Sequence, residues 1–183
     1  MIKHVVSNIE AHRRNLATTT EPLTNYEEVL YYGELKIGTD SQTMLVNFDT
    51  GSSILWIPTV DCTLCTLTPS KYDYGTGGGS FLGTFDEIEY LDGTIVEGEY
   101  MSVKVELNGL VIPSMKILAA HNYRDNNMQT NVYDGICGMS VEVLSGKEDL
   151  LVDALKTAGK ISSRVFSFHL NIRSKDSYIF FGG

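Results

Sequence analysis

The chain has 183 residues, of which 43% are hydrophobic and 20% are charged, and its formal net charge at pH 7 is −9. This length fits one domain with a sizeable hydrophobic core. The acidic balance argues against nucleic acid as a partner, and no apolar run approaches the roughly 18 residues that a membrane span needs.

The N-terminal segment, residues 1–22, differs in composition from the rest of the chain. It has a basic residue near its start but no long apolar stretch, so it is not a recognisable secretory signal. Either the protein is not secreted or a signal lies upstream of this sequence. Residues 5–16 have the pattern of a short amphipathic helix. We interpret residues 1–22 as an arm outside the core, such as a prosegment remnant, and residues 23–183 as one folded lobe.

Strand patterns follow in the next part of the chain, where apolar and polar residues alternate or apolar runs are bounded by glycine. The expected strands are residues 32–38, 43–48 and 54–57. Residues 61–83 are rich in Thr, Gly and Ser. Within them, residues 75–80 predict a flexible surface loop, because the segment lacks the Gly-Lys-Ser/Thr ending of a phosphate-binding loop.

Two hairpins are expected next. Asp92-Gly93 predicts a turn between strands at residues 85–90 and 97–106, with the hairpin tip near residues 91–95. Asn108-Gly109 predicts a second tight turn, which leads into a strand at residues 110–118.

The last third of the chain predicts one helix and three more strands. Residues 148–158 carry a helical apolar stripe, and Gly159 is expected to cap its end. The expected strands are residues 133–138, 164–172 and 177–181. The whole pattern predicts a mainly β protein with one or two short helices.

Three cysteines are present. Cys137 lies in an apolar stretch and is expected to be a small buried hydrophobe. Cys62 and Cys65 form a C-x-x-C pair. A zinc site would need two more ligands, and there is no second C-x-x-C or His pair. A thioredoxin-type redox site would need a βαβ setting, whereas the sequence around this pair is loop-like and rich in strand patterns. We favour a small structural disulfide, which would imply an oxidising compartment.

The most informative motif is D-T-G-S, at residues 49–52. An apolar run precedes it and a second apolar run follows it, which describes a loop between two buried strands. Such a loop holds the Asp49 carboxylate on rigid elements near an apolar interior, a setting that suits a group for proton transfer. Aspartic proteases use this arrangement twice, because two carboxylates share one proton and one attacking water.

Several motifs in a fixed order resemble the N-terminal lobe of the pepsin-like aspartic proteases, the pepsin and cathepsin D family. The resemblance runs from about residue 22 to residue 183. The segments that carry it are P-L-T-N-Y at 22–26, Y-Y-G-E-L-K-I-G-T at 31–39, D-T-G-S-S-I-L-W-I-P at 49–58, Y-L-D-G-T at 90–94, D-G-I-C-G at 134–138, S-F-H-L at 167–170 and F-F-G-G at 180–183.

The resemblance implies roles for the residues of the D-T-G-S loop. Asp49 would be one member of the catalytic pair, and Gly51 would let backbone N–H groups approach its carboxylate. Thr50 would tie the two lobes together through its hydroxyl. Ser52 would donate a hydrogen bond to Asp49 and orient it. Ile136 would line a side-chain pocket for substrate or, alternatively, be an ordinary core residue.

The resemblance also implies a flap, a hairpin that covers the substrate. The hydroxyl of Tyr90 would bond the indole N–H of Trp56 and hold the flap over the cleft, since both buried side chains need a partner for one polar atom. Asp92, Gly93 and Thr94 would form the flap tip, where Asp92 and Thr94 would bond the substrate backbone. Closing a flap excludes water from the reaction.

The sequence contains only one D-T-G, whereas the family uses two. We therefore expect the N-terminal half of an aspartic endopeptidase that hydrolyses peptide bonds at acid pH and is inactive as an isolated chain. The expected partners are a peptide substrate and either a missing C-terminal lobe or a second copy. One alternative is a homodimeric protease of retroviral type, and another is a lobe that binds peptides or proteins without catalysis.

No cofactor and no metal are expected. The resemblance and the expected disulfide imply residence in the secretory pathway, a lysosome or vacuole, or outside the cell.

Overall fold

The computed structural model describes residues 19–27, 30–66, 68–124, 132–144, 146–172 and 176–183. The helical pattern expected at residues 5–16 lies outside these residues. The described chain is mainly β, as the sequence predicted. Its strands are β1 (Thr19–Tyr26), β2 (Leu30–Ile37), β3 (Gln42–Asp49), β4 (Leu55–Pro58), β5 (Ser80–Glu89), β6 (Ile95–Leu107), β7 (Leu110–Arg124), β8 (Gly135–Gly138), β9 (Phe166–His169) and β10 (Ser177–Phe181), and its helices are α2 (Tyr74–Gly77) and α3 (Leu151–Thr157).

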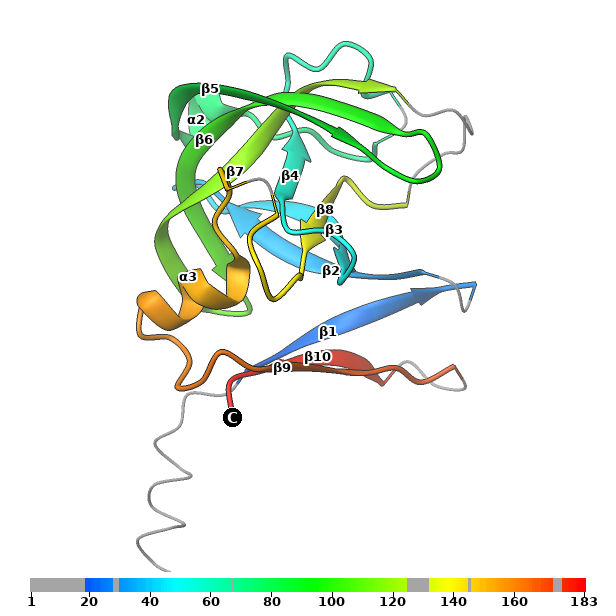
Figure 1. Cartoon of the computed structure of the whole chain (residues 1–183), viewed down its shortest axis with the longest axis vertical. Helices are drawn as coiled ribbons and strands as arrows, with labels where there is room; N and C mark the ends of the chain where they lie inside the picture. The colour runs from blue at the N-terminus through cyan, green and yellow to red at the C-terminus, as the bar shows by residue number, and fades with distance from the viewer. Residues whose placement is uncertain (1–18, 28–29, 67, 125–131, 145, 173–175) are drawn as a thin grey trace, which may run out of the picture.

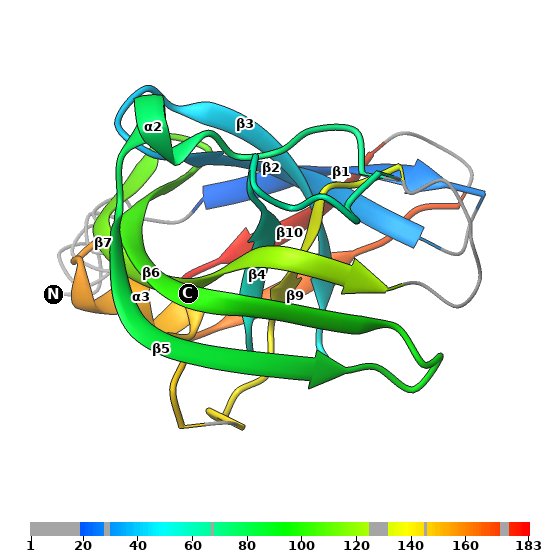
Figure 2. The same ribbon diagram turned by 90° about the horizontal axis from the view of Figure 1, so that it is seen from above.

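The described strands form one ten-stranded sheet in the order β5-β6-β7-β4-β8-β3-β2-β1-β10-β9. An additional pairing joins β6 to β2 through Ile37 and Val105, so the strands from β6 to β2 close into a barrel. Strands β5 and β6 continue beyond this barrel as a long curved hairpin at one edge of the sheet (Figure 2). The barrel is the frame that holds the site described below.

Strands β1, β10 and β9 form a layer beneath the barrel (Figure 1). Strand β1 belongs to both parts, because its first residues pair with β10 and its last residues pair with β2. It begins at Thr19, so the boundary expected after residue 22 lies inside a strand. The carboxylate of Glu21 is buried there and accepts the backbone N–H of Glu34.

Two apolar clusters fill the described structure. The larger one fills the barrel and extends to α3 and β10, with Leu35, Ile37, Met44, Ile57, Met101 and Phe181 among its fully buried members. The smaller one lies on the side of the hairpin and contains Ile54, Trp56, Cys62, Cys65, Val96, Tyr100, Leu118, Ala120, Tyr123 and Ile136. The smaller cluster supports the site.

Both predicted turns are present. The N–H of Gly93 donates to the carbonyl of Tyr90, and the tip lies where expected. At the second turn Asn108 and Gly109 both have positive φ, 41° and 82°, the conformation that a tight two-residue hairpin requires. Local sequence alone specifies these turns.

The glycine-rich segment differs from its prediction as a loop. Residues 74–77 form the short helix α2, and β5 begins at Ser80 rather than near Phe85. The side chain of Asp73 caps this helix at the N–H of Gly75. The side-chain amide of Gln42, on β3, donates to the Asp73 carbonyl at 2.7 Å and accepts its N–H at 2.8 Å. These contacts with a distant strand order a segment that looks flexible by composition.

The predicted helix is shorter than expected at its start. It runs from Leu151 to Thr157, and Leu150 before it has an extended backbone. Gly159 follows the last cap residue with a φ of 67°, as expected for a glycine at a helix end. The two helices described here have 4 and 7 residues, well below the length that would cross a bilayer.

Candidate active site

The loop that carries Asp49 connects β3 to β4, and β8 lies between these two strands. Strand β8 runs parallel to β3, where Gly138 is opposite Asp49, and antiparallel to β4. Three backbone hydrogen bonds join the loop to β8 and the residues after it: Gly138 N–H to Ile54 O at 3.0 Å, Met139 N–H to Asp49 O at 2.7 Å, and Ser140 N–H to Ser52 O at 2.9 Å. Backbone hydrogen bonds therefore fix the loop from its first residue, Asp49, to its last, Ile54.

Two glycines make this close packing possible. A Cβ atom on Gly138 would lie 2.4 Å from the carbonyl carbon of Ser53, and one on Gly135 would lie 2.1 Å from the carbonyl oxygen of Trp56. Both contacts are with backbone, which cannot move aside without displacing a strand. The D-G-I-C-G sequence thus has a physical reason: only glycine lets β8 lie this close to the loop.

Asp49 ends β3 with its side chain partly exposed. Its Oδ1 accepts the N–H of Gly51 at 2.9 Å, the backbone contact that the sequence predicted for this turn. Ser52 differs from its prediction, because its hydroxyl oxygen is buried with no hydrogen-bond partner in the described part of the chain. The bond from Ser52 to Asp49 is not formed in this structure. The next serine, Ser53, donates to the carboxylate of Glu148.

The hairpin of β5 and β6 lies across from this loop and brings Tyr90 to it. The indole N–H of Trp56 donates to the Tyr90 hydroxyl at 2.8 Å. Burial raises the pKa of Tyr90 well above its usual range, the bond from Trp56 acts against this, and the Asp49 carboxylate adds to the rise. Ser52 lies close enough to lower this pKa slightly, without hydrogen-bond geometry. The Tyr90 phenol therefore stays neutral.

The hairpin tip is ordered by its own residues. The carboxylate of Asp92 accepts the N–H of Thr94 at 2.9 Å, and the N–H of Tyr90 donates to the carbonyl of Thr94 at 2.8 Å. Gly93 has a φ of 82°, which this turn requires. Leu91 is fully exposed beside them.

The loop and the hairpin enclose a cleft of about 650 Å³. Its lining comprises Asp49 and residues 51–54 of the loop, residues 86–92 of the hairpin, and Leu144. Five of these lining residues are acidic, namely Asp49, Asp86, Glu87, Glu89 and Asp92, and no lysine or arginine is among them. A concave, acidic cleft of this size can take an extended peptide segment.

The structure brings most of the predicted site residues to this cleft, but not all of them. Trp56 lies behind the cleft and reaches it through Tyr90. Ile136 is buried against Trp56 and does not line the cleft in this chain. The Thr50 side chain is exposed outside the lining. Thr94 is buried behind the hairpin tip.

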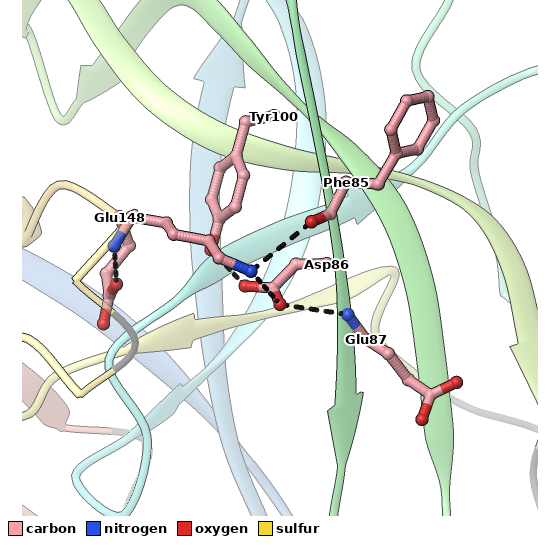
Figure 3. Close-up of polar contacts among 6 residues, drawn as sticks. Phe85, Asp86, Glu87, Tyr100 and Glu148 are labelled. Carbon is pink, nitrogen blue, oxygen red and sulfur yellow. Dashed lines mark hydrogen bonds and ion pairs between the residues drawn. The ribbon is translucent and has the colours of Figure 1, made fainter.

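Sequence reasoning missed a polar cluster beside the cleft. Lys147 forms an ion pair with Asp86 at 2.8 Å, and Tyr100 donates to the other oxygen of Asp86 at 2.9 Å (Figure 3). The adjacent Glu148 is buried and accepts the hydroxyl of Ser53. The sequence places Lys147 and Glu148 at the start of the predicted helix, where charged residues are common, so no local signal separates them from ordinary solvated residues.

The cysteines behave as predicted. Cys62 and Cys65 form a disulfide and are both buried in the smaller cluster. Cys137 is a free, buried thiol on β8, and burial raises its pKa above the usual range. Within the described residues, no group of three or more His, Cys, Asp or Glu side chains could hold a metal ion.

Comparison with known proteins identifies relatives of this chain. The family model for eukaryotic aspartyl proteases matches residues 30–183. The chain is 36% identical to procardosin-B of Cynara cardunculus over 156 residues, which are 81% of this chain and 30% of that protein. It is 31% identical to human gastricsin over 179 residues, 92% of this chain and 44% of that protein. Rhizopuspepsin-1 of Rhizopus niveus is 31% identical over 178 residues, 91% of this chain and 44% of that protein.

The chain therefore spans less than half the length of these relatives. The recognition of a pepsin-like N-terminal lobe from the sequence is confirmed.

Proposed function

This chain belongs to the eukaryotic aspartyl protease family, and we propose that it is the N-terminal lobe of an aspartic endopeptidase that hydrolyses peptide bonds at acid pH. The observation that supports this most strongly is the placement of Asp49 and Tyr90 on the two segments that enclose one cleft. The loop carries a carboxylate with a backbone donor on it, and the hairpin carries a neutral phenol fixed by Trp56.

In this proposal Asp49 is one of two carboxylates that activate a water molecule. The pair holds one proton between them, so one member accepts a proton from the water while the other donates a proton to the carbonyl oxygen of the substrate. The N–H of Gly51 keeps the Asp49 carboxylate in one orientation. The second carboxylate comes from another lobe, and the hydroxyl of Thr50, an exposed residue next to Asp49, contacts that lobe.

The hairpin acts as the substrate flap. The bond between Trp56 and Tyr90 holds it over Asp49, and the ordered tip, with Asp92, Gly93 and Thr94, presents polar groups to a peptide backbone. Closure over a bound peptide excludes water and strengthens the electrostatic interactions inside the cleft. Ile136, buried against Trp56, supports the wall of the cleft from behind.

The isolated chain is expected to be inactive, because a single carboxylate cannot act as acid and base in one step. Its partners in catalysis are a peptide substrate and a lobe that supplies the second aspartate. The buried disulfide supports residence in an oxidising compartment, such as the secretory pathway, a lysosome or a vacuole.

The first test is the coding sequence beyond the codon for Gly183. A second D-T/S-G motif there is the expected result. The extended protein should then cleave a fluorogenic peptide between pH 3 and 5 and be blocked by a statine-type inhibitor. Asp49→Asn should lower kcat/KM by about a thousandfold or more, the size expected for losing an acid–base group. Asp153→Asn, which alters an exposed ion pair on α3, is the matched control.

The same assay on the chain alone separates the alternatives. Inhibitor-sensitive cleavage that rises with the square of chain concentration, together with a dimer in analytical ultracentrifugation, would replace the two-lobed enzyme with a homodimeric protease. A monomer without a second motif, and without cleavage in any assay, would leave a peptide-binding lobe and overturn the proposal.

A further inference from the structure

Three consecutive charged residues, Lys147, Glu148 and Asp149, each contact a different element around the cleft. The Nζ of Lys147 lies 2.8 Å from Oδ1 of Asp86 on β5. Glu148 accepts the hydroxyl of Ser53 in the Asp49 loop. Asp149 accepts the backbone N–H of Lys116 on β7 at 2.8 Å. This short segment therefore joins the loop, the hairpin and the barrel.

The carboxylate of Glu148 accepts hydrogen bonds from several donors. Its Oε1 accepts the backbone N–H of Leu144 at 2.8 Å, and its Oε2 accepts the N–H of Lys147 at 3.0 Å. The carboxylate is buried, so these donors and the Ser53 hydroxyl stabilise a charge that would otherwise be costly. A buried carboxylate held this firmly fixes the position of Ser53, and with it one wall of the cleft.

Lys147 contacts the other wall. Its ammonium group also lies 3.4 Å from the carbonyl of Phe85, and Asp86 is held from a second side by Tyr100 (Figure 3). The Asp86 side chain is only 14% exposed, so solvent screens this ion pair less than a surface pair. Asp86 lies on β5, four positions before Tyr90.

The negative charge of the cleft lining gives the Lys147 ammonium group a role in holding the hairpin. The five acidic residues of the lining include three on β5, namely Asp86, Glu87 and Glu89, and Asp49 lies on the facing loop. Like charges that line one cleft repel one another, and this repulsion favours an open hairpin. Arg124 offsets part of this charge from the far side of the hairpin, at 3.9 Å from Glu87, but both of those side chains are more than half exposed. Lys147 joins the acidic strand to the side of the cleft that holds Asp49.

We propose that Lys147 and Glu148 are positioning residues that hold strand β5 of the flap hairpin and the Asp49 loop at a fixed separation. Lys147 acts on the hairpin through Asp86, and Glu148 acts on the loop through Ser53. Their significance for catalysis rests on the proposed function, but the positioning itself is a property of this chain and is measurable without any reaction.

The chain contains a single tryptophan, Trp56, which makes the test direct. Its indole N–H donates a hydrogen bond to the Tyr90 hydroxyl. The emission of Trp56 and its quenching by acrylamide therefore report whether the hairpin covers the cleft. Lys147→Gln is expected to raise acrylamide quenching and to speed hydrogen exchange at residues 87–92 by about fivefold, the effect of losing one partly buried ion pair. Amides of β10 should exchange at the wild-type rate.

Two comparisons separate positioning from general destabilisation. Lys147→Arg keeps the charge and should restore wild-type quenching and exchange. Arg164→Gln removes an ion pair of similar length, 2.9 Å to Asp153, away from the cleft, and should change neither readout. Equal effects of Lys147→Gln and Arg164→Gln would overturn the proposal.

A second variant keeps the test decisive if Lys147→Gln does not fold. Asp86→Asn retains an acceptor for Tyr100 and removes only the charge, so it should also speed exchange at residues 87–92, but by less than Lys147→Gln, because it removes one of the repelling carboxylates. The double variant should be no worse than either single one, because both remove one interaction. Unchanged exchange at residues 87–92 in Asp86→Asn would also overturn the proposal.

For Glu148, the matched pair is Ser53→Ala and Glu142→Gln. Ser53→Ala removes the hydroxyl that Glu148 accepts and should speed exchange at residues 51–54, whereas Glu142 is exposed and its replacement should have no effect. Equal exchange in the two variants would remove Glu148 from the proposal. These results are independent of the protease assay. If Lys147→Gln loosens the hairpin, the positioning role of Lys147 is supported even if the extended protein proves inactive.

Discussion

The loop that carries Asp49 and the hairpin that carries Tyr90 enclose the same cleft, but they are held in different ways. The loop is fixed by backbone hydrogen bonds to β8 and by glycines that admit no side chain. In the hairpin, the inner strand β6 pairs with β7 along its length, but the outer strand β5 is at the edge of the sheet and is largely exposed. Strand β5 and the tip have backbone pairing on one side only, and the side-chain contacts of Tyr90 and Asp86 hold them against the cleft.

This difference separates a rigid part of the site from a movable one. Backbone packing is all-or-none, since a strand cannot shift without losing several hydrogen bonds. Side-chain contacts can break singly at a cost of about 1 kcal/mol each. A lobe built this way keeps its carboxylate fixed while its hairpin opens for substrate. The following predictions test this contrast, from the largest expected effect to the smallest.

Gly138→Ala should abolish or nearly abolish folding. The new Cβ would lie 2.4 Å from the backbone of Ser53, so β8 and the loop must separate. We expect a loss on the order of 4 kcal/mol or more, measured by urea unfolding. The same change in the hairpin, Gly93→Ala, introduces the strain of a positive φ and should cost about 1–2 kcal/mol. Equal losses at the two sites would contradict the contrast.

A buried glutamate on β1, away from both the loop and the hairpin, should make stability depend on pH. Burial raises the pKa of Glu21 from 4.5 to about 7, while its bond from the Glu34 N–H acts against this. The folded state thus binds this proton more tightly than the unfolded state. Stability is full below about pH 4.5 and falls as the pH rises to about 7, by on the order of 3 kcal/mol.

Glu21→Gln keeps an acceptor for the Glu34 N–H and removes the charge, so unfolding free energies should become nearly flat over this range. Asp134, whose pKa burial also raises, leaves a smaller residual slope of the same sign. A wild-type protein that gains stability between pH 5 and 7 would show that Glu21 is not buried in solution.

Glu148→Gln should destabilise the chain by about 2 kcal/mol, because an amide nitrogen would face a backbone N–H that now donates to a carboxylate oxygen. The loss should appear in thermal or urea unfolding. Glu142→Gln, an exposed neighbour, should change stability by less than about 0.5 kcal/mol. A neutral Glu148→Gln would mean that the carboxylate is not buried as described.

Tyr90→Phe should have the smallest effect on stability, about 1 kcal/mol, because it removes one hydrogen bond and leaves the ring in place. The emission of Trp56 should change, since its indole N–H loses its acceptor. Tyr26→Phe, at an exposed ring, is the control and should change neither stability nor emission. An unchanged Trp56 spectrum in Tyr90→Phe would place the hairpin away from Trp56.

The sequence anticipated the frame of the site well. It located the strands that flank Asp49, both hairpin turns, the disulfide and the pairing of Tyr90 with Trp56. It missed the helix α2 in a glycine-rich segment and placed the start of β5 too late, because Gln42 orders that segment from a strand about thirty positions earlier.

The sequence by itself determined the features whose causes are close together in the chain. Alternation of apolar residues, Asn108-Gly109 at a turn and the D-T-G at a strand end act through neighbouring residues, so they can be read locally. The cleft and its support were decided only by the tertiary structure. Lys147 and Asp86 are 61 positions apart, and Ser53 and Glu148 are 95 apart. Charge and burial give these residues their roles, and both depend on which distant strands the closed barrel brings together.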